Sequence, residues 1–195
     1  MLLYTKNVQR SVGSVTAEFA IVMILFMMIV CGVIELARVM YMFNTLQIVS
    51  LRAATLAANA DFSDGAAMND VRARAVFRTA PGGLILGAPV TDAHVRIRYL
   101  SLGSAGGDAM AEISTVGLPA CPVNNRITCM ADPYSSSCIR MVQAEICDPA
   151  DASECKGVLY QPLFSLVGLS FALPKATVIV SAETLGALPG EAPCP

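Results

Sequence analysis

The longest apolar stretch of the chain lies near its N-terminus, where no charged residue occurs between Phe19 and Ile34. A helix needs about 20 mostly apolar residues to cross a bilayer. This run reaches that length only if residues 12–17 or 36–43 contribute. Because backbone groups in lipid must bond within their own segment, the stretch is predicted to be helical.

The helical pattern continues beyond the apolar run. Asn44 and Gln47 mark the exit into water. Apolar residues then recur at three- and four-residue spacing, at Leu46, Val49, Ala53, Leu56 and Ala60. That spacing is typical of one face of an amphipathic helix. We therefore expect a membrane helix over 14–43 and a helical extension over 44–62, together about 70 Å long at 1.5 Å per residue.

The remaining residues, 63–195, predict a globular head. Ser63 or Asp64 can cap a second helix from about Gly65 to Thr79. Alternating apolar and polar residues predict strands, at 95–99, 109–116, 141–146, 158–160 and 177–184. The Pro-, Asn- and Ser-rich region between Cys121 and Cys155 shows little periodicity. Residues 163–173 are apolar and indicate a short helix or a packed loop, either as core or as a contact surface.

These elements predict an α+β fold in which the long N-terminal helix packs on a small antiparallel sheet. Lys6 and Arg10 precede the apolar run without an acidic residue. Basic residues beside a span favour the cytoplasmic side. We expect a single-pass protein of the inner membrane, with a cytoplasmic N-terminus and a periplasmic or extracellular head.

Cysteine placement supports that topology. Six of the seven cysteines follow the span, at Cys121, Cys129, Cys138, Cys147, Cys155 and Cys194. An even set in an exported domain is typical of a disulfide framework. Because Cys121/Cys129 and Cys147/Cys155 form two local pairs, we expect those two bridges and a third between Cys138 and Cys194. Cys31 lies in the apolar run and is expected to pack there.

The start of the span carries a recognisable motif. Gly13, followed by Glu18 five positions later and then the apolar run, resembles the type IV prepilin signal. The resemblance implies that a prepilin peptidase cuts between Gly13 and Ser14, which removes the leader 1–13. Glu18 then becomes the fifth residue of the mature chain. The alternative is a plain single-span anchor that carries Glu18 incidentally.

Further motifs resemble the TadE/TadG family, the pilin-like proteins of tight-adherence (Tad or Flp) pilus systems. They are Gly13–Ala20, Gly32–Arg38, Asn44–Gln47 and Arg52–Ala54. The resemblance implies a minor pilin-like subunit with a pilin-like fold. It also implies that Glu18 and Phe19 serve peptidase recognition and helix docking. The implied partners are the prepilin peptidase, other pilin-like subunits, Tad inner-membrane assembly proteins and membrane lipid.

Glu35 and Arg38 add a possible ion pair. Three residues apart, they lie on neighbouring positions of one helix face. They can pair with each other or with the same residues of neighbouring subunits, and we favour the first because it needs no partner.

The composition excludes several other classes of function. Charged residues make up 14% of the chain, and no basic run or aromatic–basic interleaving indicates a nucleic-acid partner. His94 is the single histidine, and no C-x-x-C pair predicts a zinc site. We expect no catalytic residue, cofactor, metal or small-molecule substrate, so the protein is not an enzyme. Two alternatives to the pilus role are a membrane-anchored binding or assembly module and a type II secretion pseudopilin.

Overall fold

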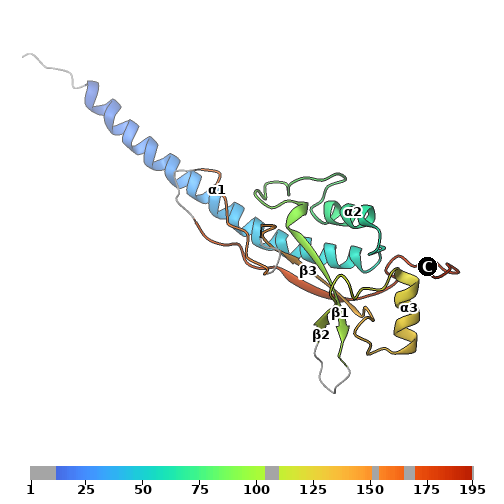
Figure 1. Cartoon of the computed structure of the whole chain (residues 1–195). Helices are drawn as coiled ribbons and strands as arrows, with labels where there is room; N and C mark the ends of the chain where they lie inside the picture. The colour runs from blue at the N-terminus through green and yellow to red at the C-terminus, as the bar shows by residue number, and fades with distance from the viewer. Residues whose placement is uncertain (1–11, 104–109, 151–153, 165–169, 195) are drawn as a thin grey trace, which may run out of the picture.

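A long helix and a four-stranded antiparallel sheet form the structure, a computed structural model that describes residues 12–103, 110–150, 154–164 and 170–194. Helix α1 (Val12–Ala57) projects from the head, and the sheet packs against its C-terminal half (Figure 1). Helix α2 (Gly65–Ala75) lies beside α1, and α3 (Pro122–Ala131) lies at the opposite end of the head from the projecting part of α1 (Figure 1). The predicted α+β class with disulfide bridges is therefore confirmed.

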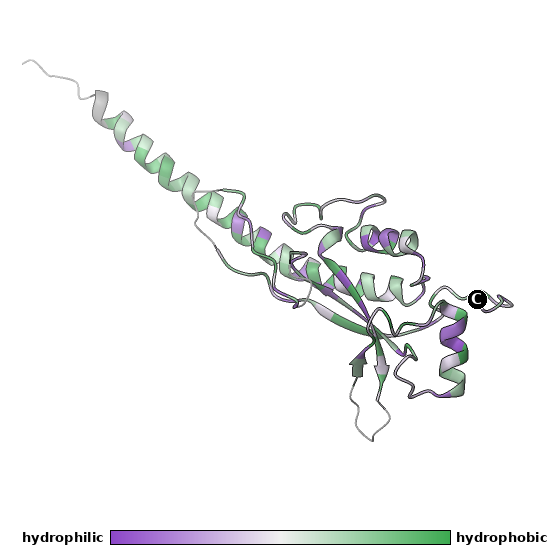
Figure 2. Ribbon diagram, in the orientation of Figure 1, coloured by the Kyte–Doolittle hydropathy of each residue, from purple (hydrophilic) through white to green (hydrophobic). Residues whose placement is uncertain are grey.

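Helix α1 is covered by the head along one face only. Every residue from Val15 to Ile29 is exposed. From Glu35 on, buried positions recur every three or four residues, at Glu35, Arg38, Met42, Leu46, Val49, Ala53 and Ala57. Figure 2 shows the projecting part as mainly hydrophobic. The helix ends at Ala57, where the carbonyl of Ala58 accepts hydrogen bonds from the Leu185 and Glu183 N–H groups at 3.0 and 3.3 Å.

The sheet has the strand order β2-β1-β3-β4. Its strands are β1 (Val95–Leu102), β2 (Met110–Glu112), β3 (Met141–Ile146) and β4 (Thr177–Ser181). Val142, Ala144 and Ile146 are buried, as the period-two pattern predicts. The strand expected over 158–160 is absent among the described residues. Only an isolated bridge joins Leu159 to Ala172 there. The described part of 163–173 holds no helix, and residues 165–169 lie outside the description.

Helix α2 begins as predicted and ends early. The Asp64 carboxylate accepts a hydrogen bond from the Ala66 N–H at 2.8 Å, which satisfies one of the free donors of the first turn. The helix stops at Ala75 rather than Thr79, and Phe77 adopts a φ of 61°. A left-handed residue cannot continue a right-handed helix, so the chain turns there toward the loop before β1.

Helix α3 corrects the expectation of an irregular region after Cys121. Pro122 stands at its first position, where a missing N–H costs nothing. The buried Asn125 faces the chain ahead of β3, where its carboxamide oxygen accepts a bond from the Ile139 N–H at 2.8 Å. A helix whose buried residues are a proline and an asparagine rather than a row of aliphatic residues gives no clear apolar stripe, which is why the pattern missed it.

The disulfides correct two of the three expected pairings. Cys147–Cys155 forms as expected, whereas Cys121 pairs with Cys194 and Cys129 pairs with Cys138. The reason is α3, which separates Cys121 from Cys129 by about 12 Å at 1.5 Å per residue. A disulfide needs Cα atoms about 4.4–6.8 Å apart. The observed Cα separations are 6.2 Å for Cys121–Cys194 and 5.0 Å for Cys129–Cys138.

Candidate functional site

The expected processing site lies at the projecting end of α1. Gly13 and Ser14 belong to its first turn. Glu18 and Phe19 lie on the exposed part of the helix, and Phe19 is 68% exposed. Among the described residues, α1 is the one helix long and apolar enough to span a membrane, which is consistent with single-pass anchoring.

The pair Glu35 and Arg38 lies where α1 enters the head. Their side chains are 1% and 6% exposed, and the closest nitrogen–oxygen distance between them is 3.7 Å. The two residues therefore do pair within the helix. A pair this deeply buried is costly unless other hydrogen bonds satisfy its remaining atoms, and loops of the head supply those bonds.

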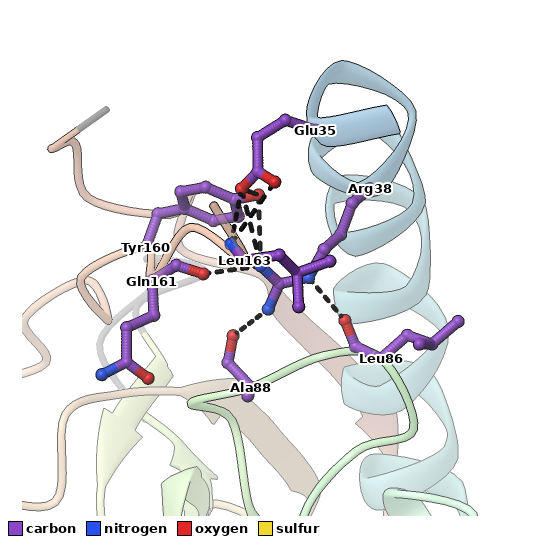
Figure 3. A network of polar contacts seen from close by, with 7 residues as sticks. All are labelled: Glu35, Arg38, Leu86, Ala88, Tyr160, Gln161 and Leu163. Carbon is purple, nitrogen blue, oxygen red and sulfur yellow. Dashed lines mark hydrogen bonds and ion pairs between the residues drawn. The ribbon is translucent and has the colours of Figure 1, made fainter. Parts of the chain in front are cut away.

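Arg38 binds the head through three main-chain carbonyls (Figure 3). Its Nε donates to the Leu86 oxygen at 2.9 Å and its Nη2 donates to the Ala88 oxygen at 2.7 Å. Its Nη1 donates to the Gln161 oxygen at 2.6 Å. A planar guanidinium can bind several fixed acceptors at once. Arg38 thus ties two loops that are far apart in sequence to one turn of α1.

Glu35 binds the second of these loops. Its Oε1 accepts a hydrogen bond from the Tyr160 hydroxyl at 2.5 Å and another from the Leu163 N–H at 3.0 Å. Hydrogen bonds to an ionised group are the stronger ones in proteins. We define the Glu35–Arg38 cluster as the side chains of Glu35, Arg38 and Tyr160 together with the main-chain groups of residues 86, 88, 161 and 163 (Figure 3).

Tyr160 joins the cluster to the aromatic core. Its ring stacks on Phe171 with centroids 4.9 Å apart, and Phe171 meets Phe43 of α1 edge to face at 6.4 Å. The Arg38 guanidinium lies 5.2 Å from the Tyr160 ring centroid. Burial raises the pKa of Tyr160, and its hydrogen bond to Glu35 raises that pKa further. The hydroxyl therefore stays protonated as the donor to Glu35.

Sequence reasoning found Glu35 and Arg38 but not what surrounds them. Besides pairing with each other, both side chains bond to loops of the head. Tyr160 lies 122 residues from Arg38 along the chain, and the remaining partners are main-chain groups, which any residue provides. The one available signal is the apolar segment 163–173, which the sequence indicates as core or as a contact surface.

His94 lies in a short 3-10 turn (Asp92–His94) before β1, not within the strand. Its Nδ1 accepts a hydrogen bond from the Thr91 N–H at 3.1 Å. Burial lowers the pKa of His94, and the carboxylates of Asp148 and Asp92 oppose that effect only in part. The folded state therefore binds the proton less tightly than the unfolded state, so stability is full above the unfolded pKa of about 6.5 and falls as the pH drops below it.

We expect the free energy of unfolding to fall more steeply between pH 7.5 and 5.5 in the wild type than in a His94→Gln variant. The slopes of unfolding free energy against pH can differ between the two proteins by at most about 1.4 kcal/mol per pH unit, because His94 binds a single proton. Urea unfolding of both proteins at several pH values measures it, and carboxylates titrate equally in both. Parallel pH profiles would contradict the expectation.

One group of side chains in the described residues is close enough for a metal ion, Glu145 with Cys147 and Cys155. Both cysteines are joined in a disulfide, and the ligand form of cysteine is the thiolate. The Glu145 carboxylate lies 3.1 Å from the Arg98 Nε. The group is therefore part of the sheet's ion pairing and its disulfide framework.

Comparisons with known proteins bear on α1. The family model of TadE-like proteins matches residues 13–55. The search of curated proteins and the search of solved structures each returned no match. The matched range includes Gly13, Glu18, Glu35 and Arg38, and it associates the chain with the pilin-like components of Tad pili. Over residues 13–55 the chain is thus TadE-like, as the motifs in its sequence indicated.

Proposed function

We propose that the protein is a minor pilin-like structural subunit in the assembly of a Tad/Flp adhesive pilus, and not an enzyme. The observation that carries the proposal is the TadE-like match over a helix whose first part, Val15–Ile29, consists entirely of exposed residues. A helix so apolar and so uncovered needs lipid or companion helices around it.

The prepilin peptidase is the first proposed partner. It cuts between Gly13 and Ser14, after which Glu18 is the fifth residue of the mature helix. By the resemblance to the prepilin signal, Glu18 and Phe19 then contribute to docking against other pilin-like subunits. The head lies on the periplasmic or extracellular side, where its three disulfides persist.

The buried Glu35–Arg38 cluster makes the helix and head one unit. The head buries side chains of α1 from Glu35 on, so we take residues 15–34 as the lipid-facing part of the membrane helix 14–43 that the sequence predicts. About 20 residues at 1.5 Å each give roughly 30 Å, the thickness of the hydrocarbon core. A force applied to α1 during assembly is transmitted to the head through the hydrogen bonds of the Glu35–Arg38 cluster.

Cleavage is tested by the N-terminus of the protein purified from membranes of the native host. We expect wild-type protein to begin at Ser14 and a Gly13→Val variant to begin at Met1, with pili lost in the variant. A Ser11→Val variant, which changes the leader but not the cut bond, is the matched control and is expected to begin at Ser14. Wild-type protein that begins at Met1 in piliated cells would contradict the proposal.

A further inference from the structure

Two uncharged segments of the head meet α1 where it leaves the head. No charged residue lies between Thr79 and Thr91 or between Gly157 and Pro174. In the described structure, residues 84–88 and 159–164 are the parts of these segments that bond to the side chains of α1. We call them the two apolar loops. Figure 2 shows mainly hydrophobic loops beside the middle of α1.

Four large apolar side chains of these loops face solvent. One is Leu159, and the other three belong to residues whose main chain bonds to side chains of α1. Ile85 is 54% exposed, Leu86 is 68% exposed and Leu163 is 56% exposed. Single exposed leucines are ordinary, but a group of them next to an apolar helix marks an interaction surface. The group lies beside the turn of α1 that follows the exposed apolar residues 15–29 and 33–34.

Main-chain bonds hold the three residues against α1 at the level of its turns from Glu35 to Tyr41. The Tyr41 hydroxyl donates to the Ile85 oxygen at 3.0 Å, and Arg38 Nε donates to the Leu86 oxygen. The Leu163 N–H donates to Glu35. Leu86 adopts a φ of 56°, a conformation that leucine rarely adopts. The bonds thus keep an unfavourable leucine conformation in place, with the side chain turned outward.

That level coincides with the edge of the expected bilayer. Glu35 directly follows the proposed span, and Arg38 lies about 4.5 Å further along the helix axis. The headgroup layers extend the bilayer from about 30 Å to about 40–45 Å. Since helix side chains lean toward the helix N-terminus, the loops bound to Glu35 and Arg38 lie within the outer headgroup layer.

We propose that the head is seated directly on the membrane, with Ile85, Leu86 and Leu163 inserted among the lipids of the outer leaflet. The loops suit this place because the main-chain oxygens of Leu86 and Ala88 are bonded to Arg38, so they need no water. The partner is the apolar boundary of the lipid headgroups, and no charged lipid is required. The inference rests on the proposed span.

The chain contains no tryptophan, so one introduced tryptophan reports its own surroundings. Three variants, Ile85→Trp, Leu86→Trp and Leu163→Trp, are placed in the full chain and reconstituted into liposomes. Tryptophan emission is measured with brominated acyl chains and, separately, with aqueous iodide. We expect a blue shift, quenching by bromolipid close to that of a Phe26→Trp variant in the span, and protection from iodide.

The matched control is Met130→Trp. Met130 is 76% exposed on α3, at the far end of the head. Its tryptophan is expected to emit at the wavelength typical of water, to be quenched by iodide and not to be quenched by bromolipid. Ile85→Trp and Leu163→Trp keep the test valid if the strained Leu86 position does not accept tryptophan.

Three results would overturn the inference. If the loop tryptophans behave like Met130→Trp while Phe26→Trp is quenched by bromolipid, the span stands and the head is not seated on lipid. If the loops become protected from iodide only at high protein density, without bromolipid quenching, their partner is another subunit. If Phe26→Trp is not quenched by bromolipid, the span and the seating both fail, whereas the cleavage test at Gly13 is unaffected.

Discussion

Replacing Arg38 with methionine is expected to lower the free energy of unfolding of the head by about 3–5 kcal/mol, the usual effect of removing one partner of a buried ion pair. The variant leaves the Glu35 carboxylate buried without its cation. It also leaves the main-chain oxygens of Leu86, Ala88 and Gln161 without their donor. Urea unfolding of the detergent-solubilised full chain, followed by near-ultraviolet circular dichroism of tyrosine, measures the change. Arg38→Lys is expected to recover little, because an ammonium cannot span three fixed acceptors.

Arg74→Met is the matched control. Arg74 and Asp70 form a shorter pair, at 2.8 Å, but their side chains are 59% and 45% exposed. Exposed pairs contribute about 0–1 kcal/mol to stability. We therefore expect Arg74→Met to destabilise the protein less than Arg38→Met, because the burial of a pair matters more than its nitrogen–oxygen distance. The double variant Glu35→Met/Arg38→Met is expected to lose less than Arg38→Met alone, since it buries no lone charge. Equal losses in Arg38→Met and Arg74→Met would refute the structural role of the cluster.

Removing the Cys121–Cys194 disulfide with two serine substitutions is expected to lower the free energy of unfolding by about 4 kcal/mol. The bridge closes a loop with a sequence separation of 73 residues. In the chain-entropy model, a longer loop restricts the unfolded chain more, so its closure stabilises the folded state more. The same urea assay under oxidising conditions measures the loss.

Loop length predicts a definite order among the cysteine variants. Cys147–Cys155 has a sequence separation of 8 residues, so its removal is expected to cost about 2.5 kcal/mol. Cys31 is the free cysteine, and Cys31→Ser is expected to change the stability by no more than about 0.5 kcal/mol. A larger loss from Cys147–Cys155 than from Cys121–Cys194 would show that loop closure does not set the stabilisation here.

Local periodicity predicted most of the regular elements. The apolar run and its three- and four-residue repeat gave α1 to within a few residues of its observed end. Alternation over 141–146 gave β3 with the bounds that the structure shows. These predictions succeed because one face of β3 and of α1 from Glu35 on is buried, so burial there repeats with the backbone period, while the first part of α1 is an uninterrupted apolar run. Helix α3 was missed because its buried residues are a proline and an asparagine, which form no apolar repeat.

The surroundings of Glu35 and Arg38 show the limit of that reasoning. The spacing of the two residues predicts an ion pair on one helix face, and the pair is present. Their main partners could not be predicted, because most are main-chain groups brought in by loops 48 to 128 residues away in the sequence. The same limit applies to the cysteines. The predicted bridge between Cys121 and Cys129 does not form, because α3 separates these two residues.

The sequence by itself determined the features whose signal lies within a few neighbouring residues. These are the apolar helix with its Gly13 and Glu18 motif, the strand alternation and the even set of cysteines after the apolar run. Only the tertiary structure decided which cysteines are joined and where the head begins along α1. It also decided that Arg38 binds two separate loops. Those outcomes depend on distances between segments that are far apart in the sequence. Hydrogen bonds to main-chain carbonyls also cannot be predicted from residue type, because every residue has a main-chain carbonyl.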